Sequence, residues 1–335
     1  WIGIKMKNKT PGAAIIGCGL IGFKRAKALG SARLVVCADI DLTKAESLAK
    51  NYPGCTSTSD WQSAIRNPDV EIVVVATTNN SLAEITSFAA REKKHVLVEK
   101  PAARNSKELK KVIQTVQENK ILVRVGFNHR YHPALLKAKE LVDAGELGEL
   151  MFIRGRYGHG GRIGYDKEWR ADPSLSGGGE LLDQGVHLID LSRWLLGDFS
   201  EVEGFAHTYF WDMPVEDNGF MLLKTSSLQT AFLHVSCTEW KNTFSFEIYG
   251  KDAKLQIEGL GGSYGLERLT FYKMLPQMGP PDTTIYEYPR GDNSWPLEFS
   301  EFLEDIKLNR TPSANLDDAL KALEIVEKIY QQSGF

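Results

Sequence analysis

The chain has 335 residues, enough for about two domains of ordinary size. Hydrophobic residues make up 42% and charged residues 25%, as in ordinary globular proteins, and the formal net charge of -3 excludes the basic surface that nucleic acid or anionic lipid would require. No apolar run approaches the roughly 20 residues of a membrane-spanning helix, so we expect neither nucleic acid nor a membrane as a partner.

The four cysteines include no CxxC pair, and we expect Cys18 and Cys37 to be small core side chains of a protein in a reducing cytoplasm. The N-terminus carries no apolar leader before a cleavage site, which also favours the cytoplasm. We expect residues 1–5 to be a cloning remnant and Met6 to be the natural start. His129 and His132 are three apart, but no third ligand has a matching spacing, so no metal is expected.

A glycine motif opens the first predicted domain. An apolar strand over 13–16 leads into Gly17-x-Gly19-x-x-Gly22, and a helix follows. Gly17 permits a tight turn, Gly19 admits a pyrophosphate close to the backbone, and Gly22 allows close packing of helix and strand. The free N–H groups of the helix N-terminus then face the phosphates. The motif predicts a dinucleotide site.

An acid follows the second predicted strand, 33–38. Asp39 comes 17 positions after Gly22, near the roughly 20 expected for a carboxylate that binds the adenosine ribose. A carboxylate accepts a hydrogen bond from a 2′-hydroxyl and repels a 2′-phosphate, so Asp39 favours NAD over NADP. The alternative is a loop glycine followed by an acid that only caps a helix.

Strands and helices then alternate along the chain. The predicted segments are strands 71–76, 95–98 and 121–126 and helices 81–93 and 107–119. This alternation predicts a doubly wound parallel sheet, an α/β Rossmann domain over 6–126. Polar Thr77 and Asn79 follow one of these strands, at the sheet edge where such folds bind ligands.

Lys100, in Glu99-Lys100-Pro101, ends another buried strand beside the expected crevice. A lysine there suits acid–base chemistry, although an exposed lysine with a local ion pair is equally compatible with the position. Further on, a helix after three glycines at 177–179 places Asp183 and His187 four apart on one face. A carboxylate that orients an imidazole is a common general acid/base, and a purely structural Asp–His pair is the alternative.

After residue 150, successive strands replace the alternation of strands and helices. A strand over 149–157 precedes a glycine-rich loop, and the segments 201–210, 218–224, 228–237, 243–249 and 252–258 read as strands of a meander. We predict loops at 259–265 and 276–289 and helices at 296–308 and 317–330. The second domain, 127–335, is therefore expected to be α+β, with a final helix that could pack back on the first domain.

The glycine motif, Glu99-Lys100-Pro101 and the Gly177-Gly178-Gly179-x-x-x-Asp183-x-Gly185-x-His187 segment together resemble the Gfo/Idh/MocA oxidoreductases, the family of glucose–fructose oxidoreductase and inositol dehydrogenase. The resemblance spans essentially the whole chain. It implies a Rossmann domain, a second domain built on a large, mostly antiparallel open sheet, and a bound nicotinamide cofactor. Thr78 departs from the family's usual proline, and Leu82 stands near a frequent family histidine.

The resemblance also implies roles for residues. Lys100 matches the lysine that bonds the reacting hydroxyl, His187 the general acid/base, and Asp183 the carboxylate that works with both. The implied cofactor contacts are Gly17, Gly19, Leu20, Ile21, Gly22, Asp39, Thr77, Asn79, Glu99, Lys100 and Asn128. The implied substrate contacts are Lys100, His159, Arg162, Tyr165, Trp169, Arg170, Asp183 and His187. For the loop members of this set, the alternative is a mobile surface loop.

The predicted activity is NAD-dependent hydride transfer between the nicotinamide and a hydroxyl-bearing carbon of a sugar, a sugar derivative such as a nucleotide sugar, or a polyol. One alternative is an NAD-dependent glycosidase that uses transient oxidation at C3. Another is a non-catalytic NAD-binding regulator. Relatives commonly pair through the open face of the second sheet, so a homodimer or homotetramer is expected.

Overall fold

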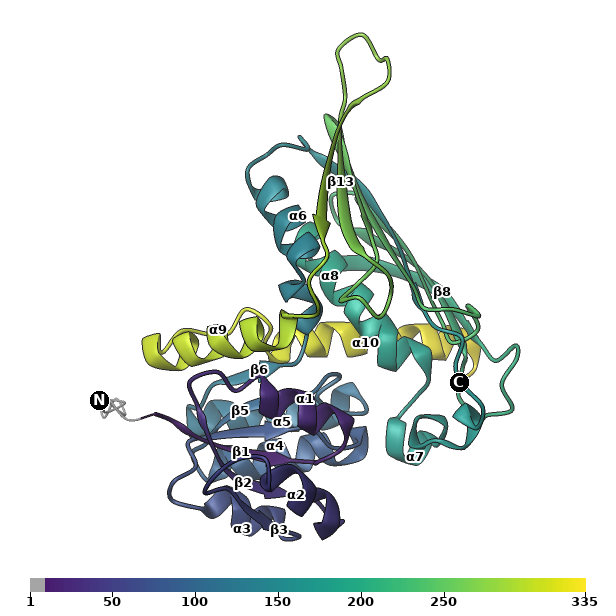
Figure 1. The fold of residues 1–335 in the computed structure, drawn as a ribbon. Coiled ribbons are helices and arrows are strands. Elements are labelled where there is room, and N and C mark those ends of the chain that lie inside the picture. Colours follow the sequence, from purple (N-terminus) through teal and green to yellow (C-terminus); the bar gives the residue numbers. More distant parts are fainter. Residues whose placement is uncertain (1–9) are drawn as a thin grey trace. The chain divides into compact units, whose positions relative to one another are not determined.

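Two sheets organise the chain in the computed structural model, which describes residues 10–335 (Figure 1). The expected cloning remnant lies outside the described residues. Contacts divide the chain into two compact units. One runs up to Gly126 and includes Trp295–Ala319, and the other comprises Phe127–Ser294 and Leu320–Phe335. The domain bounds 6–126 and 127–335 stay predictions.

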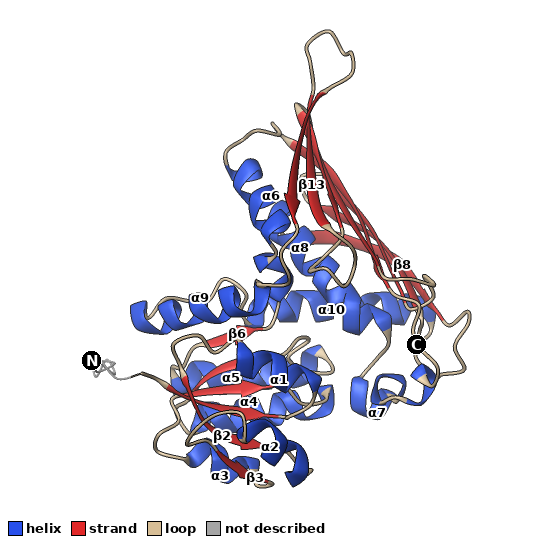
Figure 2. Ribbon diagram, in the orientation of Figure 1, coloured by secondary structure: helices blue, strands red, loops and turns tan. Residues whose placement is uncertain are grey.

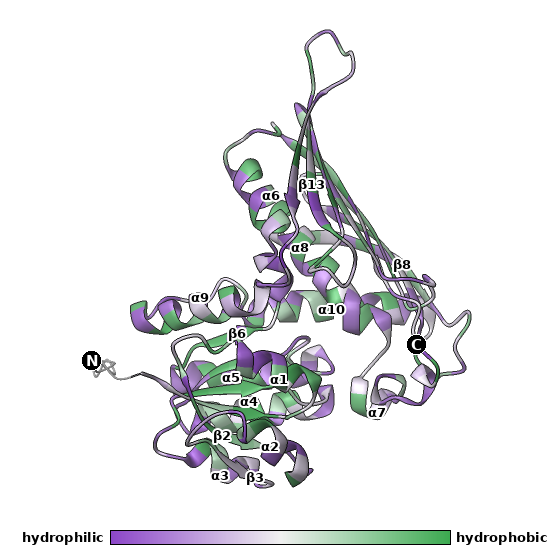
Figure 3. Cartoon of the chain, in the orientation of Figure 1, coloured by the Kyte–Doolittle hydropathy of each residue, from purple (hydrophilic) through white to green (hydrophobic). Residues whose placement is uncertain are grey.

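The sheet of the first unit is parallel throughout. Within the described residues it has six strands in the order β3-β2-β1-β4-β5-β6, the order of doubly wound dinucleotide-binding folds. Its strands are β1 (Gly12–Ile16), β2 (Arg33–Ala38), β3 (Thr56–Thr58), β4 (Ile72–Val75), β5 (His95–Val98) and β6 (Val123–Val125). The central strands are apolar and buried along their length (Figure 3), which confirms the predicted Rossmann sheet.

Helices cover this sheet (Figure 2). They are α1 (Leu20–Lys27), α2 (Leu42–Ala49), α3 (Trp61–Arg66), α4 (Asn79–Arg91), α5 (Ser106–Asn119) and α9 (Ser294–Leu308). Three of them start at a side-chain cap, because Asp41, Asp60 and Asn105 accept hydrogen bonds from backbone N–H groups of the first turn. Such a cap contributes about 1 kcal/mol, and it explains why these helices begin where they do.

Helix α9 contributes to the core of the first unit although it lies far along the chain. Its Phe299 and Phe302 are buried with Ile15 and Ile72 in one apolar cluster. Each fully buried phenylalanine stabilises the fold by roughly 1.5–3 kcal/mol. The first unit is therefore completed by a segment that follows the second sheet in sequence.

The sheet of the second unit is mostly antiparallel, as predicted. In the described part of the chain it has eight strands in the order β14-β13-β12-β11-β7-β10-β9-β8, and only β7 with β10 is a parallel pair. The strands are β7 (Leu150–Gly158), β8 (Phe199–His207), β9 (Asn218–Thr225), β10 (Thr230–Ser236), β11 (Thr243–Gly250), β12 (Ala253–Glu258), β13 (Glu267–Lys273) and β14 (Asp282–Tyr288).

The prediction of a loop over 276–289 was wrong, because β14 lies there. This edge strand is mostly exposed, so it lacks the buried apolar alternation that reveals a strand in sequence. The strands β3 and β13 were also not predicted.

Helices cover one face of the second sheet, and the other face is open. The helical elements of this unit are α6 (Pro133–Asp143), α7 (Pro173–Ser176), α8 (Val186–Leu196), most of α10 (Leu316–Ser333), the 3₁₀ turns η1 (Asn128–Tyr131), η2 (Tyr165–Lys167) and η3 (Trp169–Ala171), and the π-helical η4 (Leu181–Gly185). Helix α6 packs on β12 to β14 and α8 on β7 and β10 (Figure 2). Across residues 10–335, no helix combines the length and apolar character needed to cross a membrane.

Candidate active site

The glycine loop between β1 and α1 has the geometry of a phosphate cradle. Gly17 has φ +93°, and a Cβ there would lie 2.5 Å from the carbonyl oxygen of Ala76. A Cβ on Gly22 would lie 2.1 Å from the carbonyl oxygen of Gly17, so both positions require glycine. A Cβ on Gly19 would meet nothing within 4 Å, and Leu20 beside it is 75% exposed. The backbone is thus open at the position where a pyrophosphate must approach it.

Asp39 lies at the carboxyl end of β2 and is held by this loop. Its carboxylate accepts hydrogen bonds from the backbone N–H of Cys18 (2.7 Å) and of Asp41 (2.9 Å). Each carboxylate oxygen can accept more than one hydrogen bond, so acceptor capacity remains for a ribose hydroxyl. The residues present therefore fit a dinucleotide.

The other predicted cofactor residues of the first unit follow the carboxyl ends of β4 and β5. Thr77 donates from Oγ1 to the carbonyl of Thr78, and Asn79 is buried as the first residue of α4. Glu99 and Lys100 follow β5 directly, and Lys100 is half-buried. Strands β1, β2, β4 and β5 thus present all these residues at the same edge of the sheet.

The Glu99 carboxylate already has a buried partner. Arg25 of α1 donates from Nε to Glu99 Oε1 at 2.5 Å and also pairs with Glu298 of α9. The Trp295 ring lies 4.3 Å from the Arg25 guanidinium carbon. Burial lowers the pKa of Arg25, but the two carboxylates outweigh it and the net shift is upward. Arg25 therefore links α1 and α9 to the residue that precedes Lys100.

In the second unit, two of the three glycines, Gly178 and Gly179, make room for Glu216 and Tyr330. A Cβ on Gly179 would lie 2.0 Å from the carbonyl oxygen of Glu216, and a Cβ on Gly178 would lie 2.1 Å from the Tyr330 hydroxyl. The Glu216 side chain accepts hydrogen bonds from the backbone N–H of Gly179 and Leu181 and from Tyr330. The glycines thus admit protein groups that cap the following helix.

That helix differs from the predicted one. Residues Leu181–Gly185 are π-helical, and the α-helical part begins only at Val186. The four-residue spacing of Asp183 and His187 therefore does not have the regular α-helical geometry that we predicted. Asp183 accepts a hydrogen bond from Arg170 Nε at 3.0 Å. Such π segments often occur at functional sites.

His187 is buried in the first turn of α8, with 4% of its surface exposed. Its ring stacks on that of His129, with centroids 3.7 Å apart and planes 18° apart. Phe127 meets it edge-on at 5.9 Å. Asn128, which lies between Phe127 and His129 in the sequence, donates from Nδ2 to Ser294 Oγ at 2.8 Å.

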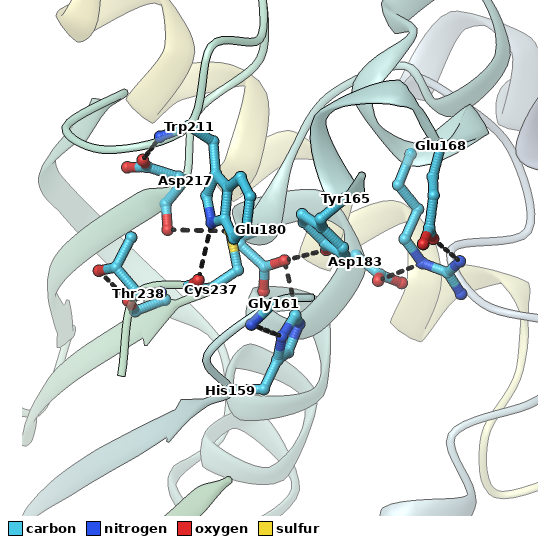
Figure 4. Close-up of polar contacts among 12 residues, drawn as sticks. His159, Gly161, Tyr165, Glu168, Glu180, Asp183, Trp211, Asp217, Cys237 and Thr238 are labelled. Carbon is cyan, nitrogen blue, oxygen red and sulfur yellow. Dashed lines mark hydrogen bonds and ion pairs between the residues drawn. The ribbon is translucent and has the colours of Figure 1, made fainter. Parts of the chain in front are cut away.

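The predicted substrate residues of the loop after β7 lie around two carboxylates, Glu180 and Asp183 (Figure 4). Tyr165 is buried and donates to Glu180 Oε1 at 2.7 Å, and His159 Nε2 lies 3.4 Å from the same oxygen. Burial raises the pKa of Tyr165, so its hydroxyl stays protonated.

The two arginines of the loop differ in their surroundings. The Arg170 guanidinium lies 4.6 Å from the Trp169 ring centroid and reaches Asp183. Burial lowers the pKa of Arg170, but Asp183 more than compensates and the net shift is upward. Arg162 is largely exposed and pairs with Glu168 at 2.7 Å. The structure therefore brings Arg170 and Asp183 together, whereas Arg162 belongs to the rim of the loop.

Two family models match the chain. Residues 12–127 match the family described as oxidoreductase family, NAD-binding Rossmann fold, and residues 135–256 match the GFO/IDH/MocA C-terminal domain. Inositol 2-dehydrogenase 2 of Saccharopolyspora erythraea is 31% identical over 266 residues, which cover 77% of this chain and 73% of that protein. The chain belongs to the Gfo/Idh/MocA oxidoreductase family.

Proteins named levoglucosan dehydrogenase are similar to this chain in sequence and in structure. Levoglucosan dehydrogenase of Pseudarthrobacter phenanthrenivorans is 35% identical over 213 residues, which are 61% of this chain and 52% of that protein, so the matched part spans about half of the relative's length. A solved structure of levoglucosan dehydrogenase in complex with NADH has a TM-score of 0.85 at 25% identity, over 97% of this chain and 98% of that one. The family matches show that the first unit is an NAD-binding Rossmann domain and that the chain belongs to an oxidoreductase family.

Three side chains around the site were not predicted for this oxidoreductase: Glu180, Glu216 and His129. Glu180 shares a helix with Asp183 and His187, and an acid inside an apolar helical segment was a usable signal. The sequence holds no such signal for the other two residues. Nothing in it places Glu216 beside the glycines or His129 beside His187. In the described range 10–335, no three His, Cys, Asp or Glu side chains are grouped as a metal ion would require.

Proposed function

We propose that this family member is an NAD-dependent dehydrogenase that oxidises a secondary hydroxyl of a sugar, a sugar derivative or a polyol. The observation that carries the proposal is the buried His187, which follows Asp183 in one helical segment, while Arg170 of η3 pairs with Asp183. The first unit supplies the glycine loop and Asp39 that fit the dinucleotide. The named activities of the relatives, on inositol and levoglucosan, support this class of substrate.

Each catalytic residue has a distinct proposed role. His187 accepts the hydroxyl proton as the general base, and Lys100 donates a hydrogen bond to the same oxygen and polarises it. Asp183, held by Arg170, keeps a negative charge near the imidazolium that forms. Bound NAD supplies the acceptor for the hydride that leaves the same carbon.

The substrate pocket is proposed to be lined by the loop after β7. Trp169 offers a flat apolar surface of the kind on which sugar rings pack, and Arg170 lies on its face. Arg170 and the exposed Arg162 are positively charged, so the pocket is also proposed to accept an anionic substituent, such as a uronate or the diphosphate of a nucleotide sugar. Tyr165, which is buried, and His159, which is partly buried, would hold the Glu180 carboxylate in place behind this loop.

The test is NADH formation with a panel of polyols, aldoses, anhydrosugars and nucleotide sugars, run with NAD and with NADP. Lys100→Ala and His187→Ala should each lower kcat by about 10²–10⁴-fold while NAD still binds. Lys107→Ala, at an exposed position of α5, is the matched control. Full activity in either site variant would refute the roles. Release of sugar from a glycoside without accumulation of NADH would indicate the glycosidase instead.

We further propose that two copies pair through the open face of the second sheet. Leu222 and Phe232 are opposite each other on β9 and β10, and each is about half exposed. Phe205, on the neighbouring strand β8, extends this apolar surface. Leu222→Lys should shift the mass in solution towards the monomer, as measured by light scattering. A cytoplasmic location stays a prediction.

A further inference from the structure

His129 lies face to face with His187, and nothing in the proposed mechanism uses it. The ring centroids are 3.7 Å apart, and His129 is itself only 6% exposed. Two imidazolium rings at this distance in a buried site would repel strongly. The pair can therefore carry one positive charge but not two, and the chemistry depends on which ring carries it.

A chain of hydrogen bonds fixes the tautomer of His129. The Ser294 hydroxyl donates to Asp292 Oδ1 at 2.5 Å, so its oxygen accepts from Asn128 Nδ2 at 2.8 Å. The Asn128 amide is thereby oriented with Oδ1 free to accept, and His129 Nδ1 lies 3.3 Å from that oxygen. An acceptor at this position requires a proton on Nδ1.

A neutral ring that presents its π face to a cation stabilises that cation. Resting on the proposed role of His187 as general base, we propose that His129 is a positioning residue for His187. Its neutral ring, held as the Nδ1–H tautomer, fixes the plane of the His187 imidazole and stabilises the protonated ring that forms when the substrate hydroxyl loses its proton.

Other titratable and charged groups also face the two rings. Tyr157 of β7 lies 5.2 Å from His129 and 6.3 Å from His187, and burial raises its pKa so that it stays neutral. Tyr264 contacts Tyr157 at 5.2 Å. His132, between η1 and α6, lies 5.6 Å from His129 and pairs with Glu267 of β13.

Two acids on the helical segment of His187 itself are paired with arginines. Asp183 binds Arg170, and Asp190 binds Arg130 of η1. A substitution at position 129 leaves all these charges in place, so a change in the titration of His187 would report the stacked ring.

The experiment compares His129→Leu with His129→Phe in the full chain with NAD. Leucine removes the π face, so the acid limb of the kcat/KM profile should move to lower pH by about one pH unit, with a loss in kcat. Phenylalanine keeps a flat ring with a π face and should restore the wild-type profile. His234→Leu is the matched control, since His234 also stacks on an aromatic ring, Phe220, at 4.4 Å on the second sheet.

A second readout does not depend on turnover. The ring signals of His187, assigned with His187→Asn, are followed by NMR as a function of pH in wild type and both variants, without substrate. The proposal requires that His187 titrates at lower pH in His129→Leu than in wild type and His129→Phe. It is overturned if the three titrations coincide, or if phenylalanine acts like leucine. An inactive wild-type protein with the expected titrations would refute the proposed function and leave the positioning role standing.

Discussion

The Oε2 atom of Glu216 accepts a hydrogen bond from the backbone N–H of Gly179, at 2.9 Å. Glu216 also accepts from Leu181, and its own carbonyl oxygen accepts from the N–H of Glu180. The residue therefore satisfies the free N–H groups at the start of the segment that carries Asp183 and His187. The hydrogen bonds from Gly179, Glu180 and Leu181 to Glu216 thus fix where this segment begins.

Gly179→Ala should strongly destabilise the protein. The new Cβ would lie 2.0 Å from a backbone oxygen of Glu216, which cannot move without breaking the cap. Overpacking of this kind costs about 1–3 kcal/mol of unfolding free energy, and the loss of the capping bonds adds to it. Urea unfolding followed by tryptophan fluorescence measures the change. Gly291→Ala, where a Cβ meets nothing within 4 Å, should leave the stability unchanged.

Glu216 should also make the stability depend on pH. Burial raises the pKa of its carboxyl to about 7 in the folded protein, against the hydrogen bonds from Tyr330 and the backbone. The unfolded chain loses this proton near pH 4.5, so the folded state binds more protons between these values, and the free energy of unfolding falls as pH rises. The stabilisation is complete below about pH 4.5 and lost above about pH 7, and it amounts to about 3 kcal/mol.

Glu216→Gln cannot ionise, so its unfolding free energy should stay nearly flat from pH 5 to pH 8. Its NH2 group cannot accept one of the backbone hydrogen bonds, so the variant should be less stable than wild type at pH 5, and this difference should shrink as the pH rises to 8. Glu258→Gln, at an exposed position of β12, should keep the wild-type slope. A wild-type slope in Glu216→Gln would show that another group titrates.

The local motifs of this chain were predictable, and the contacts across the sequence were not. Strand, glycines, helix and acid follow one another from β1 to Asp39, because the dinucleotide loop is built from one short segment. The π-helical turn at Asp183 could not be predicted from a four-residue spacing, since it depends on Glu216 and Tyr330 beside the glycines. Likewise β14 is an exposed edge strand whose pairing with β13, not its own composition, defines it.

Arg25 is the clearest case of a contact with no local signal. Its partners Glu99 and Glu298 lie 74 and 273 positions away in sequence. Arg25→Met should cost about 3–5 kcal/mol, because it leaves two carboxylates buried without their cation. The double variant with Glu298→Gln should recover part of this loss, which a double-mutant cycle measures. Arg66→Met, which removes an exposed pair with Glu92, should change the stability by less than about 1 kcal/mol.

Asp39 should decide between NAD and NADP. Asp39→Asn keeps an acceptor for the backbone N–H of Cys18 but loses the charge that binds a ribose hydroxyl strongly and repels a 2′-phosphate. We expect NAD to bind about tenfold more weakly and the preference for NAD over NADP to fall by at least as much. Calorimetric titration with both dinucleotides measures the ratio. Asp41→Asn is the control, since Asp41 caps α2 through the N–H of Thr43 and should leave that ratio unchanged. An unaltered ratio in Asp39→Asn would mean that the selectivity lies elsewhere in the site, because the substitution removes the charge of this carboxylate.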